Sequence, residues 1–164
     1  MNELPKRKRN RLSDYDYSQN GVFHITLCTA NHRKILSEVI PVGAIINRPQ
    51  IKLSATGRIA DSAIREIPVH YQSVSIEKYV IMPNHVHLLI SINQAAENNN
   101  GRLIIAPTVS RIIKQFKSEV TKKAGFSLWQ KGFYDHIIRN DADYESVWIY
   151  IDENPVKWEN DEYY

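Results

Sequence analysis

The chain has 164 residues, of which 43% are hydrophobic and 24% are charged, and its formal net charge is +3. This length and composition suit one globular domain with a hydrophobic core and argue against a largely disordered chain. No apolar run is long enough to span a bilayer and no segment resembles a signal peptide, so we expect no membrane partner. The single cysteine, Cys28, excludes an internal disulfide framework and a zinc site made of cysteines, and it fits the reducing cytoplasm.

Positive charge is concentrated in two segments of the chain. Residues 1–12 carry five basic side chains against Glu3, and residues 111–123 carry five against Glu119. Such clusters suit contacts with phosphates, although a solvated arm and an ordinary polar helix face would have the same composition. The candidate DNA-binding residues are Lys6, Arg7, Lys8, Arg9, Arg11, Arg111, Lys114 and Lys117.

The first half of the chain alternates between strand and helix patterns. A polar, basic arm ends at the turn signal Asn20-Gly21, and period-two alternation then predicts a strand over residues 22–29. One face of this strand carries Phe23, Ile25 and Leu27, and the other carries His24, Thr26 and Cys28. Residues 42–53 are typical of a hairpin that turns at 47–50. Apolar residues at helical spacing predict a helix over 54–67, which Pro68 would end.

The second half continues with a strongly apolar strand over residues 77–92, with an interruption near Pro83-Asn84. Residues 93–102 are typical of a loop, and Thr108 can cap a helix that ends at Ala124-Gly125. A strand over 129–139 follows, and Asn140 or Asp141 can cap a last helix that ends at Pro155. This order predicts an α+β sandwich of the ferredoxin-like or RRM-like kind, with helices on an antiparallel sheet and an extra β-hairpin.

The short segment His85-Val86-His87 is a candidate metal site. In a strand, residues two apart face the same way, so His85 and His87 would project together while Val86 and Leu88 enter the core. Two neutral imidazoles side by side form a good partial site for a divalent metal. A pair of surface or hydrogen-bonded histidines is the alternative, and the spacing alone does not decide between them.

The last helix carries the second candidate group. Its apolar stripe is expected at Tyr144, Val147, Trp148 and Ile151, which leaves Tyr150 on the flank of the stripe. Asn154 follows one turn later on the same side, so the helix can present a phenol and an amide oxygen together. The chain has nine tyrosines, and an ordinary hydrogen-bonded tyrosine is the alternative for Tyr150.

Together these segments resemble the single-tyrosine transposases of the HUH endonuclease group, especially the REP-associated tyrosine transposases. The resemblance covers most of the chain, and it rests on the order and spacing of several pieces rather than on one motif. These pieces are residues 15–21, 22–29, 79–87, 110–121, 129–140 and 150–158.

The resemblance implies a role for each candidate residue. His85 and His87 would be the paired histidines that bind Mg²⁺ or Mn²⁺, and Tyr150 would be the nucleophile that forms a 5′-phosphotyrosine. Asn154 falls where the family places a third, polar metal ligand, a position at which related insertion-sequence enzymes often have glutamine. His136 lies in the Asp-His step of the family pattern, where a structural hydrogen bond and a place beside the active site are both open.

The resemblance also implies an endonuclease and strand transferase that acts on single-stranded, hairpin-forming DNA in the cytoplasm, at the nucleoid. We expect a basic arm over residues 1–20, one HUH transposase domain over 21–158 and a short acidic tail over 159–164. Insertion-sequence relatives are dimers, whereas some REP-associated relatives work as monomers, so a homodimer stays open. The alternatives are a domesticated, non-catalytic DNA-binding protein, an HUH replication-initiator or relaxase-type nickase, and a structural zinc domain.

Overall fold

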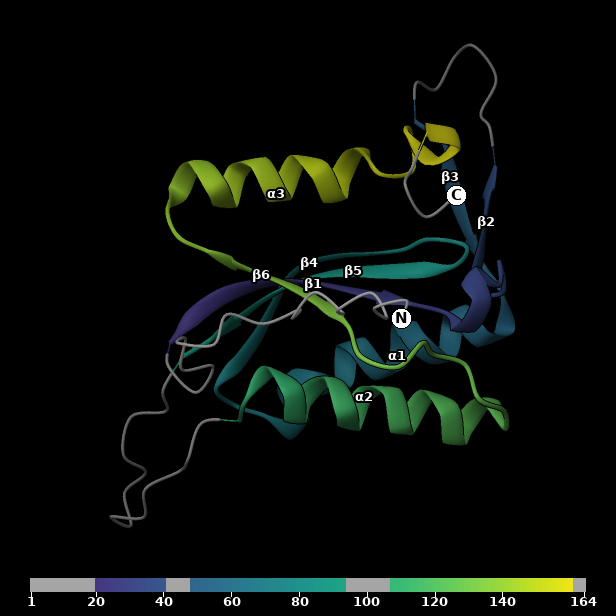
Figure 1. Ribbon diagram of the computed structural model, residues 1–164, viewed down its shortest axis with the longest axis horizontal. Helices are drawn as coiled ribbons and strands as arrows, with labels where there is room; N and C mark the ends of the chain where they lie inside the picture. Colours follow the sequence, from purple (N-terminus) through teal and green to yellow (C-terminus); the bar gives the residue numbers. More distant parts are fainter. Residues whose placement is uncertain (1–19, 41–47, 94–106, 161–164) are drawn as a thin grey trace, which may run out of the picture.

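A four-stranded antiparallel sheet forms the centre of the molecule (Figure 1). The computed structural model describes residues 20–40, 48–93 and 107–160. The strands lie in the order β4-β5-β1-β6, and their bounds are Val74–Ile81, His85–Ile92, Gly21–Cys28 and Tyr134–Ile138. Helices α1 (Ala55–His70) and α2 (Val109–Ala124) cover one face, and α3 (Asp141–Glu153) covers the other. The order β1-α1-β4-β5-α2-β6 confirms the predicted ferredoxin-like sandwich.

The face of the sheet under α1 and α2 holds the main hydrophobic core. Strand alternation sends Phe23, Ile25 and Leu27 of β1 to this face, as predicted, and Val86 and Leu88 of β5 join them. The apolar stripe of α2 packs against these strands through Val109, Ile112, Ile113, Phe116 and Val120, all at most 1% exposed. Removal of this much apolar surface from water is the main source of folding free energy.

Capping residues and glycines determine where the helices begin and end and how closely they pack. Thr108 caps α2 and Asn140 caps α3, each by accepting a backbone N–H three residues later. Gly125 ends α2 in the left-handed conformation, with φ of 80°. In α1, an ideal Cβ on Gly57 would lie 1.9 Å from the carbonyl oxygen of Leu36. Only glycine therefore allows α1 to approach the preceding segment this closely.

The extra hairpin begins earlier than the sequence indicates. It pairs β2 (Ser37–Ile40) with β3 (Gln50–Leu53), so the second strand is confirmed, and β2 is a strand that the sequence did not indicate. The first strand was expected to start at 42. Residues 41–47 lie outside the described part of the chain. A non-local bond ties β2 to the end of β4: the Ser37 hydroxyl donates to Ile81 O at 2.8 Å.

Three other boundaries differ from the prediction. The strand expected over 77–92 starts earlier, at Val74, and the interruption expected near Pro83-Asn84 is confirmed as a tight turn between β4 and β5, in which Met82 N donates to His85 O at 2.9 Å. Helix α1 continues past Pro68 to His70, because a proline in the last turn removes only one intrahelical bond. The strand expected over 129–139 is the shorter β6, and Trp129 forms only an isolated bridge to Thr29.

Helix α3 packs much less tightly than α1 and α2. It buries Val147 and Ile151, which meet Leu89 of β5 in a small second cluster. Trp148, expected in the buried stripe, is 37% exposed and stacks on Tyr144 instead. The chain then turns into a short 3₁₀ helix over Trp158–Asn160. Within the described ranges, no helix combines the length and the apolar character that a membrane crossing requires.

Candidate active site

The face of the sheet under α3 carries a row of polar side chains on three neighbouring strands. Strand register pairs Thr26 with His87, and it pairs His24 of β1 with His136 of β6. Paired residues lie on the same face, so these four side chains face away from the main core. The sheet thus separates an apolar face from a face that concentrates histidines.

His85 and His87 are deeply buried, at 0% and 1% exposed, and their ring centroids lie 4.6 Å apart. The structure therefore brings together the pair that the alternation of β5 predicts. Nδ1 of His85 lies 2.8 Å from Oδ1 of Asn84, an acceptor, so this nitrogen carries the proton and donates. Nε2 of His85 is then the nitrogen with the lone pair.

His87 is held from the neighbouring strand. Its Nδ1 lies 3.0 Å from Oγ1 of Thr26 and 3.1 Å from Nε2 of His24. Burial lowers the pKa of His87 well below its ordinary value, and the neighbouring His85 and His24 add to this effect. Burial also lowers the pKa of His24 to about 4, with a further contribution from His136. Both rings are therefore neutral near pH 7, which is the form in which imidazole binds metals.

Tyr150 lies beside these histidines in the same chain. Its ring centroid is 5.1 Å from that of His87 and 5.8 Å from that of His24, in both cases edge to face. The side chain is 38% exposed, so a substrate in solvent can reach it. Asn154, one turn later at the end of α3, is 2% exposed, and its Oδ1 is buried.

His136 has a structural partner. Its Nε2 lies 2.8 Å from Oδ1 of Asp143, a contact that joins β6 to the first turn of α3. This hydrogen bond is the main reason why the pKa of Asp143 is below its usual range. The structure displays this hydrogen bond, and the pairing of His136 with His24 also places His136 in the row of histidines.

The candidate DNA-binding residues fall into three groups. Lys6 to Arg11 lie outside the described residues. Arg111 and Lys114 are exposed on α2. Lys117 is half-buried, and its ammonium group donates to the carbonyl oxygens of Gln130, at 2.9 Å, and Gly132. Burial lowers the pKa of Lys117 to about 8. These carbonyl contacts account for Lys117 without DNA, so its role as a phosphate contact stays a prediction.

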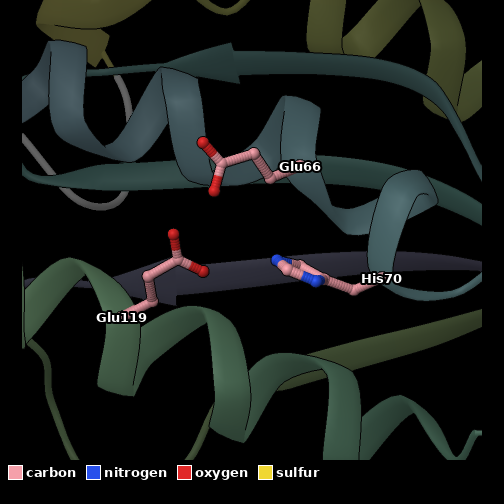
Figure 2. A group of neighbouring side chains, drawn as sticks. All are labelled: Glu66, His70 and Glu119. Carbon is pink, nitrogen blue, oxygen red and sulfur yellow. The ribbon is translucent and has the colours of Figure 1, made fainter.

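A second group of potential metal ligands lies on the other side of the sheet, between α1 and α2 (Figure 2). One ligand atom each from Glu66, His70 and Glu119 lies within 4.8 Å of the others, so the group could hold a metal ion. Lys123 Nζ, however, already lies 2.6 Å from Glu119 and 3.5 Å from Glu66. Because this cluster belongs to the opposite face, it does not test His85 and His87 as ligands.

Sequence reasoning missed three residues that contact the histidine pair: Asn84, His24 and Thr26. Alternation had placed His24 and Thr26 on the polar face of the first strand. The register that sets them beside His87 is a pairing between residues more than 60 positions apart, and no local pattern contains it. The signal for Asn84 was its position directly before the His-x-His segment.

Comparisons with known proteins agree with this fold. A family model described as "Transposase IS200 like" matches residues 17–154, a range that contains both histidines, Tyr150 and Asn154. The chain belongs to the IS200-like transposase family.

Relatives of this IS200-like transposase support the assignment. An uncharacterized protein of Haemophilus influenzae is 31% identical over 174 residues, which cover 96% of this chain and 93% of that protein. A REP-associated tyrosine transposase of Escherichia coli K12 is 29% identical over 83 residues, which cover 50% of this chain and 44% of that protein. A solved REP-associated tyrosine transposase, bound to a REP hairpin, has a similar fold: the TM-score is 0.61 at 21% identity, over 96% of this chain and 74% of that one.

Proposed function

We propose that this IS200-like transposase is a metal-dependent endonuclease and strand transferase that uses Tyr150 as its nucleophile. The observation that carries the proposal is the position of Tyr150 beside His87 within one chain, at 5.1 Å between ring centroids. Of the described tyrosines with an exposed ring, it is the one next to the paired histidines. A nucleophile beside a candidate metal site has the arrangement that phosphoryl transfer needs.

The donor atoms of the site fit a divalent metal. His85 and His87 are buried and adjacent, and their Nδ1 atoms take part in hydrogen bonds with protein groups, so Nε2 is the nitrogen that each would offer. Asn154 would add an amide oxygen from the end of α3. This incomplete set of nitrogen and oxygen donors leaves positions for substrate and suits Mg²⁺ or Mn²⁺. When bound there, the cation would supply Lewis-acid stabilisation for the scissile phosphate.

Tyr150 then performs the covalent step. Its phenol oxygen forms a bond to phosphorus, the bond from phosphorus to the 3′ oxygen breaks, and the 3′ oxygen leaves as a hydroxyl after it gains a proton. The phenol proton passes to solvent. A 5′-phosphotyrosine results, and attack by another 3′-hydroxyl reverses the step and joins strands. One phosphoester bond replaces another at each step, so no ATP is needed. A phenol has an ordinary pKa of about 10, so its deprotonation needs local electrostatic help.

Single-stranded, hairpin-forming DNA is the proposed substrate, because the solved relative with the same fold was bound to a REP hairpin. Arg111 and Lys114 on α2 and the basic arm of residues 6–11 would contact phosphates. The same proposal includes one transposase domain over residues 21–158 and action at the nucleoid. A homodimer is not needed to bring Tyr150 to the histidines, because one chain holds both.

The test is a covalent adduct assay. The protein is incubated with a labelled single-stranded hairpin oligonucleotide and Mn²⁺, and a protein–DNA adduct that survives denaturation is measured. We expect wild type to form the adduct and Tyr150→Phe to form none. Tyr134→Phe is the matched control, because Tyr134 is also exposed, at 52%, but lies on β6. If Tyr150→Phe forms as much adduct as wild type, the proposed nucleophile is wrong.

The same assay separates the other functions. A domesticated DNA-binding protein would shift the hairpin in a gel without any adduct, with either metal. A nickase would form the adduct and release a cut strand but would not join it to a second 3′-hydroxyl strand. We expect the joined product, with a double-stranded control left uncut.

A further inference from the structure

We propose that Thr26 and His24 are positioning residues that hold the proton of His87 on Nδ1 and so leave Nε2 with a lone pair for the metal. This inference deepens the proposed function and rests on it. It comes from the contacts of Nδ1 of His87, which lies 3.0 Å from the Thr26 hydroxyl and 3.1 Å from Nε2 of His24. Thr26 and His87 are both buried, so water does not compete for these contacts.

The direction of these hydrogen bonds decides whether His87 can bind a metal. A neutral imidazole has one N–H, and only the other nitrogen has a lone pair to donate. If Thr26 donated its hydroxyl proton to Nδ1, then Nε2 of His87 would carry a proton and repel a cation. If Nδ1 of His87 donates to Thr26 or His24, then Nε2 can bind it. Ligating histidines commonly donate their other N–H to an acceptor in this way.

The neighbouring His85 favours the second arrangement. Its Nδ1 faces Oδ1 of Asn84, which can only accept, so His85 already has its lone pair on Nε2. The same tautomer at His87 gives two equivalent nitrogen donors on rings whose centroids are 4.6 Å apart. Asn84 therefore sets the tautomer of one ring, and Thr26 with His24 sets that of the other.

His24 is itself held in place from the other side. It lies on the central strand β1 and faces His136 across the β1–β6 pair. His136 is fixed by Asp143 at 2.8 Å. His24 therefore has His136 as its register partner on one side and Nδ1 of His87 at 3.1 Å on the other. Thr26 is better placed still, because it is the direct register partner of His87.

The first test reads the tautomer directly. The nitrogen-15 chemical shifts of the imidazole side chains are recorded for the metal-free wild-type protein and for Thr26→Val, which keeps the shape and removes the hydroxyl. We expect the proton of His87 on Nδ1 in wild type, and a mixture of tautomers in Thr26→Val. A wild-type protein with the proton on Nε2 would overturn the proposal, and this result needs no variant to fold.

The second test measures Mn²⁺ affinity in the absence of DNA. Removal of such supporting groups typically weakens metal binding about 10- to 100-fold. We expect a loss in this range for Thr26→Val and for His24→Leu, and recovery in Thr26→Ser and in His24→Gln, whose amide can place an acceptor near the original Nε2. His32→Asn is the matched control, because His32 is an exposed histidine whose ring contacts Gln130 and not the histidine pair, and it should bind Mn²⁺ as wild type does.

The outcomes separate this inference from the proposed function. If Thr26→Val and His24→Leu keep wild-type Mn²⁺ affinity while the unfolding midpoint falls, both residues are only structural and the inference is wrong, although the adduct assay stands. If Tyr150→Phe still forms the adduct, the proposed nucleophile fails, but the tautomer and the affinities are unaffected.

Discussion

The two faces of the central sheet differ in the side chains that they bury. The face under α1 and α2 is a continuous apolar core, whereas the face under α3 combines a three-residue cluster of Leu89, Val147 and Ile151 with a row of histidines. Strand β5 serves both, because Val86 and Leu88 point into the core while His85 and His87 point to the other side. Burial of polar rings costs free energy unless they are hydrogen-bonded. The apolar face can offset that cost, so the polar face is available for chemistry.

A matched pair of substitutions gives the largest contrast. Ile112 of α2 and Ile151 of α3 are 0% and 1% exposed, one on each face. Ile→Ala in a core costs about 2–5 kcal/mol, and more where the surroundings cannot collapse. We expect Ile112→Ala to lose about 4 kcal/mol and Ile151→Ala about 2 kcal/mol in urea unfolding. An equal or larger loss for Ile151→Ala would show that α3 carries as much of the stability as α2.

Gly57 should show how rigid the apolar side is. Gly57→Ala places a Cβ 1.9 Å from the carbonyl oxygen of Leu36, and backbone cannot move aside as a side chain can. We expect a loss of about 3 kcal/mol, at the upper end of the cost of overpacking, although alanine favours a helix by about 1 kcal/mol. Gly125→Ala is the control: its Cβ meets nothing within 4 Å, and only the left-handed backbone, at about 1 kcal/mol, opposes it. A neutral Gly57→Ala in thermal unfolding would contradict the close approach.

Loss of the N-cap of α3 should destabilise only α3 on one face of the sheet, whereas loss of the N-cap of α2 on the other face should destabilise the whole protein. Asn140→Ala and Thr108→Ala each remove a cap worth about 1 kcal/mol. Since α3 buries few side chains, we expect Asn140→Ala to speed amide hydrogen exchange within α3 and to leave the core strands protected. Thr108→Ala should lower the global unfolding free energy instead. Uniform loss of protection in Asn140→Ala would mean that α3 unfolds only with the rest of the protein.

The smallest expected effect concerns DNA binding by the outer surface of α2. Each phosphate contact removed should lower the slope of log affinity against log salt by about one unit. Arg111→Gln and Lys114→Gln should each do so for a hairpin oligonucleotide in fluorescence anisotropy. Lys117→Gln should instead destabilise the protein, because its ammonium group binds backbone carbonyls. Unchanged slopes for both α2 variants would confine DNA binding to the α3 side and the arm.

Local patterns predicted the parts of the site that depend on one element. Alternation placed His85 and His87 on one face, and helical phase placed Asn154 one turn after Tyr150. The partners of His87 could not be predicted, because they depend on how β1 pairs with β5. The fold class followed from the order of elements, whereas β2 at 37–40 was not predicted, because its bond from Ser37 to Ile81 joins residues 44 positions apart and no local pattern contains it.

The tight turn between β4 and β5 should lower the entropic cost of binding a metal ion at His85. The carbonyl oxygen of Asn84 accepts from Thr29 N at 2.9 Å, that of Pro83 accepts from Leu36 N at 2.9 Å, and the Asn84 side chain holds the ring of His85. The backbone that carries the first histidine therefore has little conformational freedom left to lose. An ion that binds there would meet a preorganised site, with a small entropic cost.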